Sequence, residues 1–166
     1  MFERVAETLN ITLDTSELVS VYRNHLPKIK LFEDASTMLQ AVRTRYALGL
    51  ITDGYAQVQR NKVAALGVEP FFDSIVYSDD LGRDAWKPSP IPYQRTMSNL
   101  AHHADRFVFI GDNPSKDFVT ARKLGWRTVR VERPTRVHAD VDWPADHRAE
   151  VTVQSLADIP WKRLGG

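Results

Sequence analysis

The stretch from Thr52 to Gly54 has residue types that could bind a phosphate group. Thr52 ends the apolar run 47–52 ("ALGLIT"), and Asp53 with Gly54 forms a turn ahead of a helical pattern. A hydroxyl beside the free backbone N–H groups of a helix start makes a cradle for phosphate. The alternative is an ordinary Asp-Gly turn, which the stretch taken alone favours. The side chain of Asp53 is expected to cap the helix rather than to face a phosphate.

A lysine and two aspartates elsewhere in the chain suit the same chemistry. Lys87 lies in the proline-rich loop "AWKPSP", where a lysine can neutralise phosphate as a compact point charge. Asp112 follows the apolar run 106–111, and Asp117 comes five positions later, in the first turn of the next predicted helix. Carboxylates at these positions suit a hard cation such as Mg²⁺. The alternatives are a solvated lysine, a helix cap, and an acid favoured by the helix dipole.

Short apolar runs alternate with longer helical patterns along most of the chain. The patterns between the runs include one opened by an Asp14/Glu17 capping pair, one that Asp34 can cap, and one that stops at Gly67. Connections of this length indicate an α/β fold, a mainly parallel sheet with helices on both faces. In such sheets ligands bind beyond the carboxyl ends of the strands. The predicted strands are 47–52, 74–78, 106–111, 127–131 and 150–153.

The composition excludes several classes of function. The 166 residues suffice for one domain, and the net charge of +1 gives no field that would favour nucleic acid or a membrane surface. The absence of cysteine excludes disulfides, thiolate metal sites and a cysteine nucleophile. No apolar run approaches the roughly 18 residues of a membrane helix, so we expect a cytoplasmic protein. A plain dinucleotide-binding domain is disfavoured, since neither Gly-x-Gly-x-x-Gly nor a Walker-type loop is present.

The order of the candidate residues resembles the haloacid dehalogenase (HAD) superfamily of hydrolases. Thr52, then Lys87, then Gly-Asp-x-x-x-x-Asp follow successive predicted strands, and the resemblance runs from about residue 31 to the end. It implies a three-layer, Rossmann-like core. Most members are Mg²⁺-dependent phosphatases, in which an aspartate attacks phosphorus and water then hydrolyses the aspartyl-phosphate. The resemblance therefore implies a small phosphorylated substrate.

The resemblance also implies a role for each candidate residue. It gives Thr52, Lys87 and Asp117 catalytic roles and makes Asp112 a ligand of Mg²⁺. Thr52, Asp53, Gly54 and Lys87 are implied to bind the phosphate. Phosphoryl transfer depends chiefly on positioning and on neutralising oxygen charge, which these residue types supply.

The nucleophile motif of the family is not found in this chain. That motif is an apolar strand followed by Asp-x-Asp, whereas the only Asp-x-Asp here, at 140–142, lacks such a strand and is predicted to be a loop. By resemblance, residues 1–30 are the remnant of a helical cap and 31–166 are the core without its central first strand. Two interpretations stay open: a chain shortened at its amino end, or a non-catalytic member that binds a phosphorylated ligand or another chain. An in-frame Asp-x-Asp-x-Thr strand encoded upstream of Met1 would favour the enzyme.

The absent strand would belong between 47–52 and 106–111. Its loss would leave a slot of roughly 9.5 Å, two strand spacings, bordered by unpaired backbone groups. Open sheet edges of this kind favour strand swapping or self-association.

Overall fold

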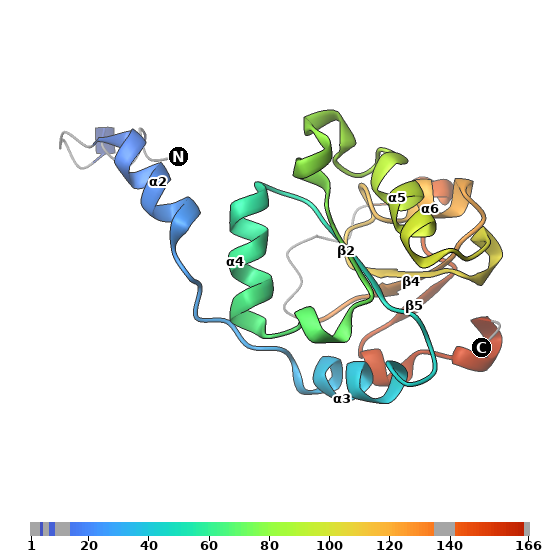
Figure 1. Cartoon of the computed structure of the whole chain (residues 1–166). Helices are drawn as coiled ribbons and strands as arrows, with labels where there is room; N and C mark the ends of the chain where they lie inside the picture. Colours follow the sequence, from blue (N-terminus) through green and yellow to red (C-terminus); the bar gives the residue numbers. More distant parts are fainter. Residues whose placement is uncertain (1–3, 5–6, 9–13, 135–141, 165–166) are drawn as a thin grey trace.

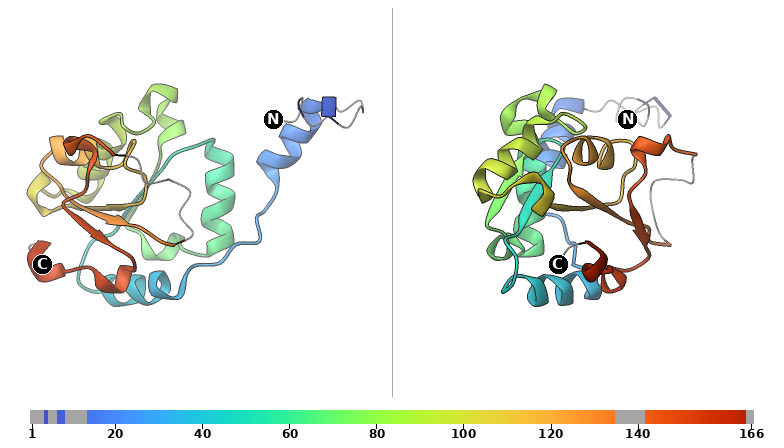
Figure 2. Two further views of the ribbon diagram at one scale, coloured as in Figure 1. Left: turned by 180° about the vertical axis from the view of Figure 1, so that it is seen from behind. Right: turned by 90° about the vertical axis from the view of Figure 1, so that its right-hand side faces the viewer.

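The computed structural model describes residues 4, 7–8, 14–134 and 142–164. Helix α2 stands outside the main body and is joined to it by an extended segment that leads to α3 (Figures 1 and 2). The helices are α2 (Thr15–Asn24), α3 (Glu33–Val42), α4 (Ala56–Leu66), α5 (Ile91–Leu100) and α6 (Phe118–Lys123). Short 3₁₀ turns are η1 (Glu69–Phe71), η2 (Ser78–Leu81), η3 (Arg83–Ala85), η4 (Ala104–Arg106), η5 (Ala145–His147), η6 (Leu156–Asp158) and η7 (Trp161–Leu164). No described helix is both long enough and apolar enough to cross a bilayer.

All five predicted strands are present, and all pair in parallel. They are β1 (Gly49–Thr52), β2 (Ser74–Tyr77), β3 (Val108–Gly111), β4 (Arg127–Val131) and β5 (Val151–Val153). They form two sheets, β1-β2 and β3-β4-β5, instead of one. Among the described strands, β1 and β3 are therefore each paired along one edge only. The α/β class and the mainly parallel pairing are confirmed, and the division falls between β1 and β3.

Successive residues of β1 face different helices, which gives three layers. Leu50 packs with the cluster that contains Leu39 of α3 and Val63 of α4. On the other face, a Cβ at Gly49 would lie 2.8 Å from Thr96 of α5. Ile51 packs on the same side, against the aromatic core. This alternation is the period of two expected for a strand covered on both faces, and it confirms the three-layer arrangement.

An aromatic core fixes β3 and α6 beneath the candidate site. Phe107, which precedes β3, stacks on Trp126 with ring centroids 4.4 Å apart. Tyr93 of α5 meets the edge of Trp126 at 5.5 Å and lies 5.3 Å from Phe109 of β3. Phe118, at the start of α6, is fully buried in the same cluster. Aromatic contacts of this kind add to the stability from burial, so the carboxyl end of β3 is held on a rigid base.

Asp34 ties α3 to the segments that follow β4 and β5. The prediction that it caps α3 is wrong, because the cap position is Phe32 and the carboxylate accepts other donors. Both oxygens lie 2.9 Å from Arg133, and one also accepts from the hydroxyl of Ser155 at 2.8 Å and the N–H of Leu156 at 2.9 Å. Burial opposes the charge, but these donors outweigh it and lower the pKa of Asp34 to about 2.

We expect Asp34→Ala to lower the free energy of unfolding at neutral pH by about 2 kcal/mol, the scale of hydrogen bonds to a charged group. Because the folded-state pKa is about 2 and the reference value is 3.8, the stabilisation is complete above about pH 4 and is lost as the pH falls toward 2. Urea unfolding of both proteins at several pH values between these limits measures the effect. A difference that stays constant down to the lowest pH would contradict this assignment.

Candidate active site

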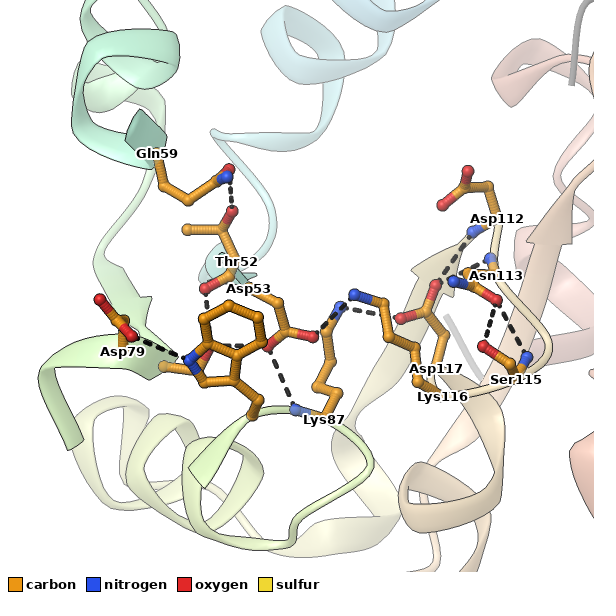
Figure 3. A network of polar contacts seen from close by, with 12 residues as sticks. Thr52, Asp53, Gln59, Asp79, Lys87, Asp112, Asn113, Ser115, Lys116 and Asp117 are labelled. Atoms are coloured by element: carbon orange, nitrogen blue, oxygen red, sulfur yellow. Dashed lines mark hydrogen bonds and ion pairs between the residues drawn. The ribbon is translucent and has the colours of Figure 1, made fainter. Parts of the chain in front are cut away.

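Four charged side chains meet between the carboxyl ends of β1 and β3 (Figure 3). Lys87 Nζ lies 2.8 Å from Asp117 Oδ1, and Lys116 Nζ lies 2.9 Å from Asp53 Oδ2. The carboxylates are buried, with side-chain exposures of 3% for Asp117 and 2% for Asp53. Both ammonium groups point into the space between the two carboxylates. The two sheets are thus joined at this edge by two ion pairs.

Asp53 turns inward from the end of β1. Its Oδ1 accepts hydrogen bonds from the hydroxyl of Ser78 at 2.6 Å and from the backbone N–H of Lys87 at 3.2 Å. Burial works against the charge, but the Ser78 hydroxyl and the ammonium groups of Lys87 and Lys116 outweigh it and lower the pKa of the carboxyl group. Asp53 therefore anchors the Lys87 loop and Lys116 beside β1.

The prediction that Asp53 caps α4 is wrong. The backbone N–H of Ala56, at the start of that helix, donates instead to Asp79 Oδ2 at 2.9 Å. Asp79 belongs to η2, the turn that follows β2. The Asp53 side chain is drawn away from the helix because Ser78 and the two lysines gather on its other side.

The turn after β1 is covered by Gln59 of α4. The Thr52 hydroxyl donates to Gln59 Oε1 at 2.8 Å. Gly54 has φ +121°, and a Cβ there would lie 2.7 Å from Gln59 Nε2. The positive φ favours glycine here, whereas the Gln59 amide lies at the end of a flexible side chain and could shift away from a Cβ. The structure thus directs the Thr52 hydroxyl toward α4. Contact of Thr52 or Gly54 with a phosphate group stays a prediction.

Asp117 organises the loop after β3 as well as Lys87. It occupies the cap position of α6, and its Oδ2 accepts from the backbone N–H groups of Asp112 at 3.3 Å and Asn113 at 2.9 Å. The hydroxyl of Tyr93 lies 3.0 Å from the backbone carbonyl of Asp117, to which it donates. Burial, then the negative charge of Asp117, raises the pKa of Tyr93, which stays a neutral donor. Asp117 is therefore a positioning residue for both Lys87 and Asp112.

Asp112 follows β3 directly, as predicted, and lies on the loop that Asp117 holds (Figure 3). Within the described residues no group of three or more His, Asp or Glu side chains could hold a metal ion by itself. Magnesium commonly retains several waters and binds one or two carboxylates together with substrate phosphate. Asp112 at this strand end fits such a partial ligand set.

The sequence-based reasoning missed Lys116 and Ser78 as members of the site. Ser78 follows the second strand in the same way that Thr52 ends the first, so strand-end position was an available signal. Lys116 carried no such signal, since it was predicted to begin the next helix; it lies in the turn before α6. Asp140 and Val141 of the Asp-x-Asp sequence lie outside the described residues, and Asp142 is exposed and pairs with Arg148.

Comparison with known proteins decides the family. Residues 1–131 match the family model described as haloacid dehalogenase-like hydrolase. The chain belongs to this family of hydrolases. A crystal structure of a HAD phosphatase from Thermococcus onnurineus superposes with a TM-score of 0.68 at 25% identity, covering 97% of this chain and 68% of that chain. The resemblance seen in the sequence and the α/β fold are confirmed.

Curated relatives of this HAD chain are named as phosphatases. Glyceraldehyde 3-phosphate phosphatase of Methanocaldococcus jannaschii is 30% identical over 123 residues, 74% of the chain and 53% of the relative. Phosphoserine phosphatase of Thermus thermophilus is 30% identical over 121 residues, which are 72% of the chain and 48% of the relative. Pyrophosphatase PpaX of Halalkalibacterium halodurans is 29% identical over 149 residues, which are 86% of the chain and 66% of the relative. The chain thus spans about half the length of the first two relatives.

Proposed function

We propose that the protein carrying this HAD chain is a Mg²⁺-dependent phosphatase that acts on a small phosphorylated metabolite through an aspartyl-phosphate. The observation that carries the proposal is the meeting of Lys87, Lys116, Asp53 and Asp117 at the carboxyl ends of β1 and β3. The names of the relatives support a phosphatase. The cytoplasmic location inferred from the sequence belongs to the same proposal.

In this proposal each described residue has a limited task. Lys87 neutralises the phosphate oxygens, Asp117 positions Lys87, and the backbone of the turn from Thr52 to Gly54 donates N–H groups to the phosphate. Asp112 would hold Mg²⁺, which supplies further positive charge when bound. These contributions stabilise charge at fixed positions, which is the main requirement of phosphoryl transfer.

The nucleophile is proposed to lie on a further parallel strand between β1 and β3. Among the described residues, neither buried carboxylate of the site is available for attack. Asp53 is bound by Ser78, by the Lys87 N–H and by Lys116. Asp117 is bound by Lys87 and by the two loop N–H groups. The free edges of β1 and β3 could pair with such a strand, including one supplied by another copy.

This engagement of both carboxylates also favours a second candidate function. A HAD chain that binds a phosphorylated ligand without hydrolysing it needs the lysines and the turn but no nucleophile. The two candidates share phosphate binding and differ in turnover.

Calorimetric titration of orthophosphate into the chain in the presence of Mg²⁺ tests the shared part. We expect binding that is weakened by about tenfold or more in the double variant Lys87→Met/Asp117→Asn, because one ammonium contact with phosphate is lost. Both members of the ion pair are replaced together, so that no buried charge is left unpaired and the variant is expected to stay folded. Undetectable orthophosphate binding by the wild-type chain would contradict both candidates.

Phosphate release from p-nitrophenyl phosphate separates the two candidates. We expect no turnover from the chain alone and turnover after addition of a synthetic peptide that carries the family's first motif, lost when its first aspartate is asparagine. Phosphate binding without turnover, both by the chain alone and with the peptide added, would favour the second candidate, a chain that binds a phosphorylated ligand without hydrolysing it. Turnover of about 1 s⁻¹, ordinary for an enzyme, by the chain alone and absent in Asp112→Ala would place the nucleophile in this chain.

A further inference from the structure

Two arginines and two aromatic rings form a cluster beside the candidate active site. Arg23 of α2 lies over the ring of Tyr55, with Cζ 3.9 Å from the ring centroid. Arg83 of η3 lies 4.3 Å from the same centroid and 4.4 Å from that of Trp86. Tyr55 and Trp86 meet edge to face at 6.2 Å. We call these four residues the arginine–aromatic cluster.

The arginine–aromatic cluster adjoins the phosphate-binding elements in both sequence and space. Trp86 directly precedes Lys87, and Tyr55 follows Asp53 by two residues. The indole N–H of Trp86 donates to Asp79 Oδ1 at 3.1 Å, and the other oxygen of Asp79 caps the start of α4. The cluster is therefore fixed to the same two loops that carry Lys87 and Asp53.

Helix α2 brings Arg23 to this position through contacts with α4. The side-chain amide of Asn61 donates to the backbone carbonyls of Arg23 at 3.3 Å and His25 at 3.0 Å. These bonds hold the carboxyl end of α2 against α4. Arg23 thus reaches Tyr55, which lies two residues after Asp53, from a helix outside the main body (Figure 1).

The guanidinium groups of the cluster retain N–H donors for a ligand. Arg23 takes part in none of the ion pairs found among residues 14–134 and 142–164. Arg83 approaches Asp79 only to 3.7 Å, and its side chain is 55% exposed. Hydrogen bonding from Arg83, the charges of both arginines and a weaker hydrogen bond from Arg23 lower the pKa of Tyr55, which indicates a positive environment. The Tyr55 hydroxyl accepts only part of the five N–H donors of each guanidinium group. Stacking on aromatic rings fixes guanidinium planes and leaves their edges open.

We infer that the arginine–aromatic cluster binds a second anionic group of the substrate. Guanidinium groups bind phosphate and carboxylate through paired hydrogen bonds, and both kinds of group fit this site. The inference rests on the proposed phosphate site at Lys87 and narrows its substrate class to phosphate compounds with a further phosphate or carboxylate. Of the substrates in the relatives' names, pyrophosphate and phosphoserine have such a group and glyceraldehyde 3-phosphate lacks one.

Calorimetry on the chain with four ligands tests this inference. The ligands are orthophosphate, pyrophosphate, phosphoserine and glycerol 3-phosphate, and the buffer contains EDTA so that complexes with Mg²⁺ do not contribute. We expect pyrophosphate or phosphoserine to bind about tenfold or more tightly than glycerol 3-phosphate, the scale of one charge-assisted contact. A preference for pyrophosphate identifies a phosphate as the second group, and a preference for phosphoserine identifies a carboxylate.

Two variants test whether the preference for a second anionic group arises from the arginine–aromatic cluster. Arg23→Gln/Arg83→Gln should remove it and leave the affinity for glycerol 3-phosphate within about twofold, because the phosphate contacts at Lys87 are unchanged. Arg60→Gln is the matched control, since Arg60 stacks on Tyr77 and pairs with Asp80 outside the cluster. Equal affinities in the wild-type chain, or a preference that survives in the double variant, would overturn the inference and leave the phosphate site intact. If no ligand binds in EDTA, the four titrations are repeated with Mg²⁺ present, and failure of all four there would overturn the phosphate site itself.

Discussion

Replacing Lys87 with methionine should lower the free energy of unfolding by about 3–5 kcal/mol, the range for breaking a buried ion pair by removing one partner. The loss arises at Asp117, whose side chain is 3% exposed and whose Oδ1 lies 2.8 Å from the ammonium group. Methionine preserves the apolar stem and leaves the carboxylate buried without its cation. Equilibrium unfolding in urea, read by tryptophan fluorescence, measures the change.

Two further variants show whether the effect has this cause. Asp117→Asn in the Lys87→Met background should recover most of the lost stability, because the amide carries no charge and its oxygen can still accept the loop N–H groups. Lys116→Met should cost only about 1 kcal/mol, since its ammonium group is more exposed and Asp53 keeps two other donors. Equal and small losses for Lys87→Met and Lys116→Met would contradict the role given to the Lys87–Asp117 pair.

The sequence predicted the strands and the edge of the sheet at which the site forms. Apolar runs of four to six residues separated by helical patterns leave few alternatives to parallel pairing, and polar residues that follow such runs share one edge. Thr52, Lys87, Asp112 and Asp117 were therefore predicted to lie near one another, and the structure brings their loops into one region (Figure 3).

The partners of these side chains could not be predicted, because they come from distant parts of the chain. Asp53 belongs to a turn whose sequence favours a helix cap, yet its partner Lys116 lies 63 residues away along the chain. Asp34 likewise bonds to Arg133, 99 residues away, instead of capping its helix. In both cases tertiary donors outweigh the local preference of aspartate for a cap. Local sequence contains no information on which distant donors will be near.

Replacing Gly111 with alanine should disrupt the site through Asp117, although the substitution adds only one methyl group. A Cβ at this position would lie 2.7 Å from Asp117 Oδ2 and 3.0 Å from Asp117 Cγ. Asp117 cannot move aside cheaply, because it holds Lys87 and the backbone of Asp112 and Asn113. We expect a loss of about 2–3 kcal/mol in unfolding free energy, at the upper end of overpacking effects. Orthophosphate binding should fall by about tenfold as Lys87 loses its support.

A double-mutant cycle with Asp117→Ala separates this clash from a general intolerance of alanine at the end of β3. In the Asp117→Ala background the side chain that meets the new methyl group is gone, so Gly111→Ala should cost less than about 1 kcal/mol. The remaining cost would come from Phe109, whose Cε1 would lie 3.0 Å from the Cβ. Urea unfolding of the wild type, the two single variants and the double variant gives the coupling energy. Its sign identifies the cause, because only a clash with Asp117 makes Gly111→Ala less costly after Asp117→Ala. Additive losses would mean that the backbone at Gly111, and not the placement of the Asp117 carboxylate, requires glycine.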